Sequence, residues 1–141
     1  MEAGVQRAAT VLVADDESDV RSFAQAALER LGHTVLVADN GRQAIETLRA
    51  NSAVDLVLLD VVMPVIGGGE VLAEIRKCWP DIAVLVTSGY NREEARRLGS
   101  IPEGLPFIEK PFTLQALADA VQSVLERRSR RRPAAIREIN R

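Results

Sequence analysis

The stretch TVLVADD, from Thr10 to Asp16, sets a pattern that the rest of the chain repeats. A run of β-branched and aliphatic residues ends abruptly at two aspartates, which predicts a buried strand with a pair of carboxylates at its carboxyl end. Three further runs stop at a polar residue in the same way: LVLL leads into Asp60, IAVLV into Thr87 and FIE into Lys110. These stretches therefore predict strands whose carboxyl ends all carry a chemically active group.

Longer stretches with apolar residues at helical spacing lie between these runs, so strands and helices alternate along the chain. We expect strands over 10–14, 34–38, 55–59, 82–86 and 107–109, and helices over 20–31, after the cap Asn40, over 70–78, over 91–98 and from the cap Thr113 to about residue 128. The first helix is expected to turn Phe23 inward, and the last helix to turn Leu114 inward. Strict alternation predicts an α/β fold with a doubly wound, five-stranded parallel sheet.

Right-handed crossovers in such a sheet place the first strand beside the third, with a change of winding direction between them. We therefore expect Asp15, Asp16 and Asp60 to share one crevice beyond the carboxyl ends of these strands. Three carboxylates this close repel one another unless a cation neutralises them, and oxygen ligands suit Mg²⁺, with Mn²⁺ nearly as good. The sequence thus predicts a divalent metal site.

A carboxylate beside such a cation can attack a phosphorus centre and form an aspartyl phosphate. The reaction requires that charge on the transferring oxygens be stabilised from several sides. The hydroxyl of Thr87 and the ammonium of Lys110 follow the last two strands and are the groups expected to supply that stabilisation. The pattern therefore indicates phosphoryl transfer.

Taken in order, these residues resemble the receiver domain of two-component response regulators, in the CheY-like superfamily. The resemblance spans residues 8–127 and rests on Asp15-Asp16, on Asp60 with Met63-Pro64 downstream, on Thr87-Ser88, and on Lys110-Pro111-Phe112. It implies a flavodoxin-like (βα)5 fold with strand order 2-1-3-4-5. It also implies phosphoryl transfer from a sensor histidine kinase or a histidine phosphotransfer protein. Such a domain catalyses its own phosphorylation and dephosphorylation as a signalling protein rather than as a metabolic enzyme.

The resemblance also implies a role for each site residue. Asp60 would be the phosphorylated nucleophile. Asp16 and Asp60 would bind Mg²⁺ through their side chains, Asp15 would bind it mainly through water, and the backbone carbonyl of Val62 would complete the protein ligands. Lys110 would pair with the phosphoryl group.

Thr87 and Phe107 would form a switch in a domain of this family. On phosphorylation Thr87 would be drawn toward the phosphoryl group, and the ring of Phe107 would fill the space that it leaves. The face formed by the fourth helix, the fifth strand and the fifth helix would then change. That face is where we expect a downstream protein target or a second copy of the chain to bind.

Two departures from the usual family pattern lie next to Asp60. Gly67-Gly68-Gly69 stand where an acidic cap and a single glycine are usual, so we expect a helix start without a side-chain cap and a loosened loop. Val62 is apolar where a polar side chain could position an attacking water. We therefore expect slow loss of the phosphoryl group.

The charge of the chain is unevenly distributed. From residue 127 onward seven arginines and one glutamate give +6, so the net charge of −2 leaves −8 for residues 1–126. We expect an N-terminal leader over 1–8, the receiver domain over 9–127 and a basic, flexible tail over 128–141. The lone Cys78 and the lack of an apolar run of about 18 residues favour a cytoplasmic location without a membrane span. The short remainder after the receiver leads us to expect no DNA-binding domain.

Several alternatives stay open on the sequence. The chain could be a docking scaffold that is never phosphorylated, a phosphate shuttle, or the receiver of a hybrid kinase. A haloacid-dehalogenase-type phosphohydrolase would need a second aspartate two residues beyond the first, and Asp15-Asp16-Glu17 lacks that spacing. A nucleotide-binding module would need a glycine-rich phosphate loop after the first strand, and the sequence has none there. His33 has no acidic or cysteine partner at ligand spacing, so it is interpreted as a turn residue.

Overall fold

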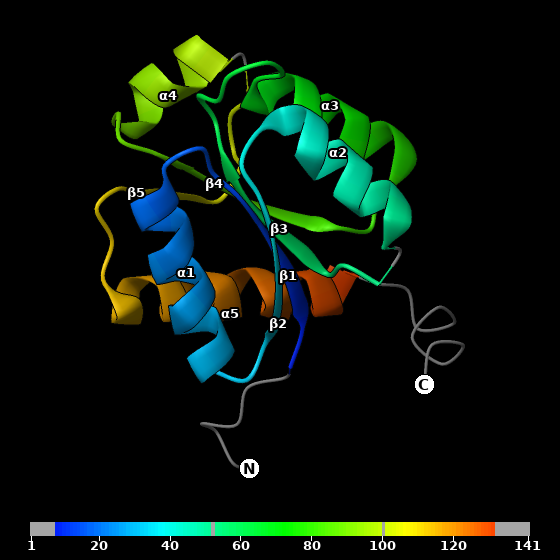
Figure 1. Cartoon of the computed structure of the whole chain (residues 1–141), viewed down its shortest axis with the longest axis vertical. Coiled ribbons are helices and arrows are strands. Elements are labelled where there is room, and N and C mark those ends of the chain that lie inside the picture. Colours follow the sequence, from blue (N-terminus) through cyan, green and yellow to red (C-terminus); the bar gives the residue numbers. More distant parts are fainter. Residues whose placement is uncertain (1–7, 52, 100, 132–141) are drawn as a thin grey trace.

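A computed structural model of the chain describes residues 8–51, 53–99 and 101–131. The strands form one parallel sheet in the order β2-β1-β3-β4-β5, which confirms the expected flavodoxin-like topology (Figure 1). The strands are β1 (Thr10–Ala14), β2 (Thr34–Ala38), β3 (Leu56–Asp60), β4 (Ala83–Ser88) and β5 (Phe107–Glu109). The helices are α1 (Ser18–Arg30), α2 (Gly41–Ala50), α3 (Gly68–Cys78), α4 (Arg92–Gly99) and α5 (Leu114–Arg131). Within these ranges, no helix is both long and apolar enough to cross a membrane.

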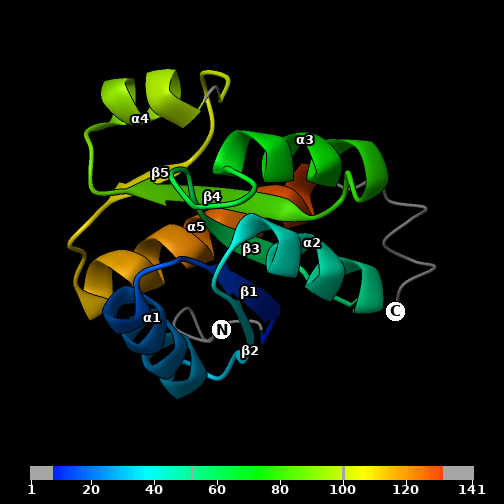
Figure 2. The ribbon, with the colours of Figure 1, turned by 45° about the horizontal axis from the view of Figure 1, so that its top comes forward.

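Two hydrophobic clusters, one on each face of the sheet, form the core. Side chains alternate along β1, so that Val11 and Val13 belong to the cluster with α1 and α5, whereas Leu12 and Ala14 belong to the cluster with α2, α3 and α4. Figure 2 shows the sheet between these two groups of helices. Every residue of β3 is buried, as its apolar run indicates for a strand that is covered on both faces.

Several element boundaries differ by one to three residues from those expected, and three of the differences lie near the polar ends of the strands. α1 begins at Ser18 rather than at residue 20, and its N-cap is Glu17, whose side chain does not cap the helix. α3 begins at Gly68 rather than at residue 70. β4 continues to Ser88, because Ser88 pairs with Glu109 of β5. Thr87 is therefore a strand residue in a fixed register and not the first residue of a loop.

Two residues that were expected to face the core are exposed. Phe23 retains 43% of its accessible surface and Leu114 retains 38%. The ring of Phe23 lies 6.1 Å, centroid to centroid, from the ring of Phe112, which follows β5. Phe23 thus packs beside the segment between β5 and α5 at the edge of the apolar face of α1. Helical spacing alone could not separate that edge from the part of the face that meets the sheet.

The interpretation of His33 as a turn residue was incomplete, because its side chain is 5% exposed. Its Nδ1 accepts a hydrogen bond from the backbone N–H of Ala9 at 3.1 Å. Burial lowers the pKa of His33, against smaller opposing effects of this hydrogen bond and of Asp55. His33 therefore acts as a neutral acceptor that joins the end of α1 to the start of β1.

α5 continues past the expected end of the domain at residue 127. The Nε of Arg128 donates to the carbonyl oxygen of Asp81 at 2.7 Å, and its Nη1 lies 3.2 Å from Oδ1 of Asp55. Arg128 is therefore part of the folded domain rather than of a tail. Residues 1–7 of the expected leader and residues 132–141 of the expected tail lie outside the described residues.

Candidate functional site

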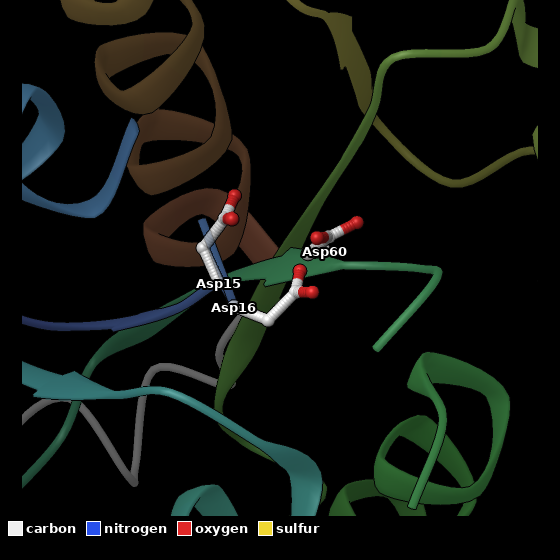
Figure 3. Close-up of side chains that lie close together, drawn as sticks. All are labelled: Asp15, Asp16 and Asp60. Carbon is white, nitrogen blue, oxygen red and sulfur yellow. The ribbon is translucent and has the colours of Figure 1, made fainter. Parts of the chain in front are cut away.

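The three predicted carboxylates meet at the carboxyl ends of β1 and β3. Asp15 and Asp60 are buried, with 2% and 3% of their surface exposed, whereas Asp16 is exposed. Each offers a carboxylate oxygen, and these oxygens all lie within 4.8 Å of one another; Figure 3 shows the three side chains at the strand ends. The donor set consists of oxygen atoms and is open on the side of Asp16. It fits a hard divalent cation such as Mg²⁺.

Backbone N–H groups orient the two buried carboxylates. Oδ1 of Asp15 accepts a hydrogen bond from the N–H of Glu17 at 2.9 Å, and Oδ1 of Asp60 accepts one from the N–H of Val62 at 3.1 Å. Each aspartate is thus held by the N–H two residues ahead of it, a local turn that does not depend on a distant partner. In both side chains the second oxygen, Oδ2, is left for Lys110.

Gly68 packs directly against the backbone that carries Asp60. A Cβ atom at position 68 would lie 2.6 Å from Cα of Val61 and 2.8 Å from the carbonyl oxygen of Asp60. The expected absence of a side-chain cap at the start of α3 is confirmed, since the N-cap is Gly67. Gly68 thus permits a close backbone contact with the end of β3 that a larger residue would prevent, whereas the expectation of a loosened loop stays a prediction.

Lys110 lies among the acidic groups, and 8% of its side-chain surface is exposed. Its Nζ lies 3.1 Å from Oδ2 of Asp15, 3.3 Å from Oδ2 of Asp60 and 2.6 Å from Oε1 of Glu17. The N–H of Lys110 donates to the carbonyl oxygen of Ser88 at 2.8 Å, and the following bond to Pro111 is cis. The ammonium is therefore positioned over the phosphoacceptor predicted from the sequence.

Burial, with a smaller contribution from neighbouring negative charge, raises the pKa of the two buried carboxyl groups. Burial and then the charge of Asp15 raise the pKa of Asp60 to about 7, although Lys110 and the N–H of Val62 act in the opposite direction. Burial also raises the pKa of Asp15. For Lys110, burial lowers the pKa, but the carboxylates of Glu17, Asp60 and Asp15 together raise it above its usual value. The single positive charge of Lys110 thus does not neutralise the carboxylates around it, whereas an added divalent cation would neutralise them.

Thr87 lies beside Asp60, because the two residues are register partners in the pairing of β3 with β4. Its side chain is fully buried, and its Oγ1 has no hydrogen-bond partner within the described part of the chain. A buried hydroxyl that makes no hydrogen bond is costly, so such groups are uncommon in folded proteins. A ligand oxygen on Asp60 would supply the missing partner.

The predicted switch residue Phe107 is half-buried at the start of β5, where it pairs with Val86. The guanidinium of Arg92, at the start of α4, lies 5.6 Å from the centroid of the Phe107 ring. Such a contact is a cation–π interaction that links α4 to β5. Sequence reasoning did not identify Arg92, because no local pattern connects it to Phe107.

Val62 lies two residues after Asp60, and 45% of its surface is exposed. It forms part of an open groove of about 580 Å³ that continues past Met63, the three glycines, Tyr90 and Leu98. None of the three predicted metal-binding carboxylates lines this groove. The use of the Val62 carbonyl as a metal ligand stays a prediction.

Glu17 is the site residue that sequence reasoning missed. Its side chain makes the shortest of the ion pairs of Lys110, although 59% of that side chain is exposed. The available signal was its position directly after the acidic pair. That signal is weak, since exposed glutamates are common at the start of helices.

Comparisons with known proteins agree with this geometry. Residues 11–122 match the family model of the response regulator receiver domain. The sensor kinase CckA of Brucella abortus is 39% identical over 120 residues, which are 84% of this chain but 13% of the kinase. The response regulator receiver protein CpdR of the same organism is 30% identical over 115 residues, 82% of this chain and 95% of that protein. A crystal structure of a response regulator receiver domain protein from Clostridium thermocellum superposes with a TM-score of 0.76 at 31% identity, covering 86% of this chain and 97% of that one.

Proposed function

Because the chain belongs to the response regulator receiver domain family of two-component systems, we propose that it accepts a phosphoryl group from a phosphohistidine donor onto Asp60. An oxygen of the Asp60 carboxylate attacks the phosphorus, the phosphorus–nitrogen bond of the phosphohistidine breaks, and the imidazole nitrogen keeps the electron pair. The donor is a sensor histidine kinase or a histidine phosphotransfer protein. The resulting aspartyl phosphate is the signal.

Asp15, Asp16 and Asp60 are the side chains that would hold Mg²⁺, with the carbonyl of Val62 as a further ligand. When bound, Mg²⁺ neutralises charge on the carboxylates and on the transferring oxygens. The raised pKa of Asp60 supports this part of the proposal, because a nearby cation favours the ionised carboxylate that the attack requires. Mn²⁺ suits the same donor set.

The observation that carries the proposal is the unpartnered hydroxyl of Thr87. This hydroxyl is buried in register with Asp60, so a phosphoryl oxygen on Asp60 would come within its reach. Lys110 approaches the same carboxylate from Oδ2, at 3.3 Å. The two groups would stabilise negative charge on the phosphoryl group from different directions.

Incubation with Mg²⁺ and acetyl phosphate tests the proposal directly. Intact-mass measurement is expected to show the addition of one phosphoryl group, and peptide mapping is expected to place it on Asp60. The variant Asp60→Asn is expected to show no adduct. Absence of an adduct on the unaltered protein, with beryllofluoride also failing to bind, would leave the non-phosphorylated docking scaffold as the better description.

The output would pass through α4, β5 and α5. On phosphorylation the hydroxyl of Thr87 moves toward the phosphoryl group, and the half-buried ring of Phe107 moves into the vacated space. The contact between Arg92 and Phe107 supports this route, because inward movement of the ring would change a contact with α4. The altered face would bind a downstream protein or a second copy of the chain.

The relatives favour two contexts for this receiver. The similarity to CckA, of which the chain spans 13%, favours a role in a phosphorelay or as the receiver of a hybrid kinase. The similarity to CpdR, of which the chain spans 95%, favours a separate regulator. In either context we propose a cytoplasmic location, where the free thiol of Cys78 stays reduced. The apolar, exposed side chain of Val62, two residues after Asp60, further leads us to propose slow hydrolysis of the aspartyl phosphate.

A further inference from the structure

Lys110 makes its shortest ion pair outside the group of carboxylates that would hold the metal. The distance from its Nζ to Oε1 of Glu17 is 2.6 Å, compared with 3.1 Å to Asp15 and 3.3 Å to Asp60. Glu17 is not one of the three residues whose carboxylate oxygens gather within 4.8 Å. It is therefore a fourth carboxylate at the site, and within residues 8–51, 53–99 and 101–131 its ion-pair partner is Lys110.

Hydrogen bonds hold the backbone of Glu17 in place, whereas its side chain can move away from Lys110 without breaking them. Its N–H donates to Oδ1 of Asp15 at 2.9 Å, and its carbonyl accepts from the N–H of Arg21 in the first turn of α1. Glu17 is the N-cap of α1, yet its side chain makes no capping hydrogen bond. The side chain reaches across to Lys110, which lies 93 residues away in the sequence. Since the Glu17 carboxylate is exposed to water and Lys110 is not, Glu17 is the partner that can be exchanged at low cost.

We propose that Glu17 is a positioning residue that forms an ion pair with Lys110 while Asp60 is unphosphorylated. This ion pair breaks when Asp60 carries a phosphoryl group, which then pairs with Lys110 instead. The inference rests on the proposed function, in which Lys110 pairs with the phosphoryl group. A phosphoryl oxygen and Oε1 of Glu17 then compete for the same ammonium. Glu17 thus lowers the affinity of the site for phosphoryl groups.

Beryllofluoride, which occupies the place of a phosphoryl group on an aspartate, is the probe for this competition. With Mg²⁺ present, Glu17→Gln is expected to bind beryllofluoride about two- to fivefold more tightly than the unaltered protein, the range that a partly exposed ion pair allows. Asp19→Asn is the matched control, because Asp19 is an exposed acid in the first turn of the same helix and is not among the ion-pair partners of Lys110. Equal tightening in both variants, no change in Glu17→Gln, or weaker binding in Glu17→Gln would each overturn the proposal.

Glu17→Asp separates the contact from the charge. Aspartate keeps the negative charge at position 17 but is one methylene shorter, so it loses the 2.6 Å contact with Lys110. Beryllofluoride binding is expected to tighten in this variant as well. Tightening in Glu17→Gln without tightening in Glu17→Asp would show that a general charge effect, and not the hold on Lys110, is responsible.

A measurement on Lys110 itself does not depend on phosphorylation. In protein labelled with nitrogen-15 and free of Mg²⁺, the ammonium protons of Lys110 are expected to exchange with water faster in Glu17→Gln than in Asp19→Asn or the unaltered protein. If beryllofluoride fails to bind to any variant, the proposed function fails, and this exchange rate still decides whether Glu17 holds the lysine. Identical exchange in all three proteins would overturn the role of Glu17 while leaving the proposed function intact.

Discussion

Replacement of Thr87 by valine is expected to make the protein more stable. The Oγ1 atom of Thr87 is buried and has no partner within the described residues. Mutational data place the cost of burying an unpaired hydroxyl at about 1–3 kcal/mol. Valine keeps the branched shape and suits a strand. We therefore expect the free energy of unfolding of Thr87→Val to rise by about 1 kcal/mol, with an increase of roughly 3–5 °C in the melting temperature.

The same substitution is expected to weaken the site. A hydrogen bond to a charged group contributes about 1.5–3 kcal/mol, so loss of the Thr87 donor should lower the affinity for beryllofluoride by roughly 10- to 100-fold in the presence of Mg²⁺. Stability and phosphoryl binding would then change in opposite directions. That combination is typical of a group whose partner is present only in the active state.

Ser88→Ala is the matched control for these measurements. Ser88 is also buried, but its Oγ accepts a hydrogen bond from the N–H of Tyr90 at 3.1 Å. Its removal should lower the free energy of unfolding by about 1 kcal/mol, because the N–H of Tyr90 loses its acceptor. Urea denaturation followed by circular dichroism measures stability in all three proteins, and calorimetric titration measures beryllofluoride binding. Destabilisation of Thr87→Val to the level of Ser88→Ala would refute the reasoning, since it would mean that the Thr87 hydroxyl has a partner in solution.

Three further predictions concern the charge and the backbone of the site. The pKa of Asp60 is raised from 3.8 to about 7 in the fold, so protonation of Asp60 favours the folded state; this contribution is present in full below pH 3.8 and is lost as the pH rises from there through about 7. Without metal, Asp60→Asn should therefore gain stability relative to the unaltered protein as the pH rises over this interval, and Mg²⁺ should abolish the difference; equal urea midpoints at every pH would contradict this. Gly68→Ala should lower the free energy of unfolding by about 2 kcal/mol or more and reduce phosphorylation, because the added Cβ would lie 2.6 Å from Cα of Val61. Gly67→Ala is the control: its Cβ would lie 4.0 Å from the nearest atom, the carbonyl oxygen of Val61, so the substitution should have a smaller effect on stability and on phosphorylation. Val65→Gly should raise the free energy of unfolding by about 1 kcal/mol, measured by thermal or urea denaturation. Val65 is a β-branched residue with 68% of its surface exposed, and its φ of 71° is strained for such a residue but not for glycine. Unchanged or lower stability would argue against backbone strain at Val65.

The order of the elements could be predicted because hydrophobic periodicity is a local property of the chain. β1, β2 and β5 have the predicted bounds, and the buried β3 follows from its apolar run. The ends of α1, α3 and β4 were less predictable, since the last residues of an element depend on the backbone partners that the sheet supplies. The prediction that Phe23 faces the core was wrong for a related reason. Periodicity shows that a residue lies near the apolar face of a helix, but it does not show which neighbouring element packs on that residue.

The sequence by itself determined the fold class and the convergence of Asp15, Asp16 and Asp60, because parallel strands with right-handed crossovers bring their polar carboxyl ends to one edge. Only the tertiary structure decided how those groups are paired. It brings Glu17 to Lys110, leaves the hydroxyl of Thr87 without a partner and presses Gly68 against the end of β3. These two contacts and the unpartnered hydroxyl all depend on ångström-scale distances between segments that are far apart in the chain. No local pattern of residues encodes such distances.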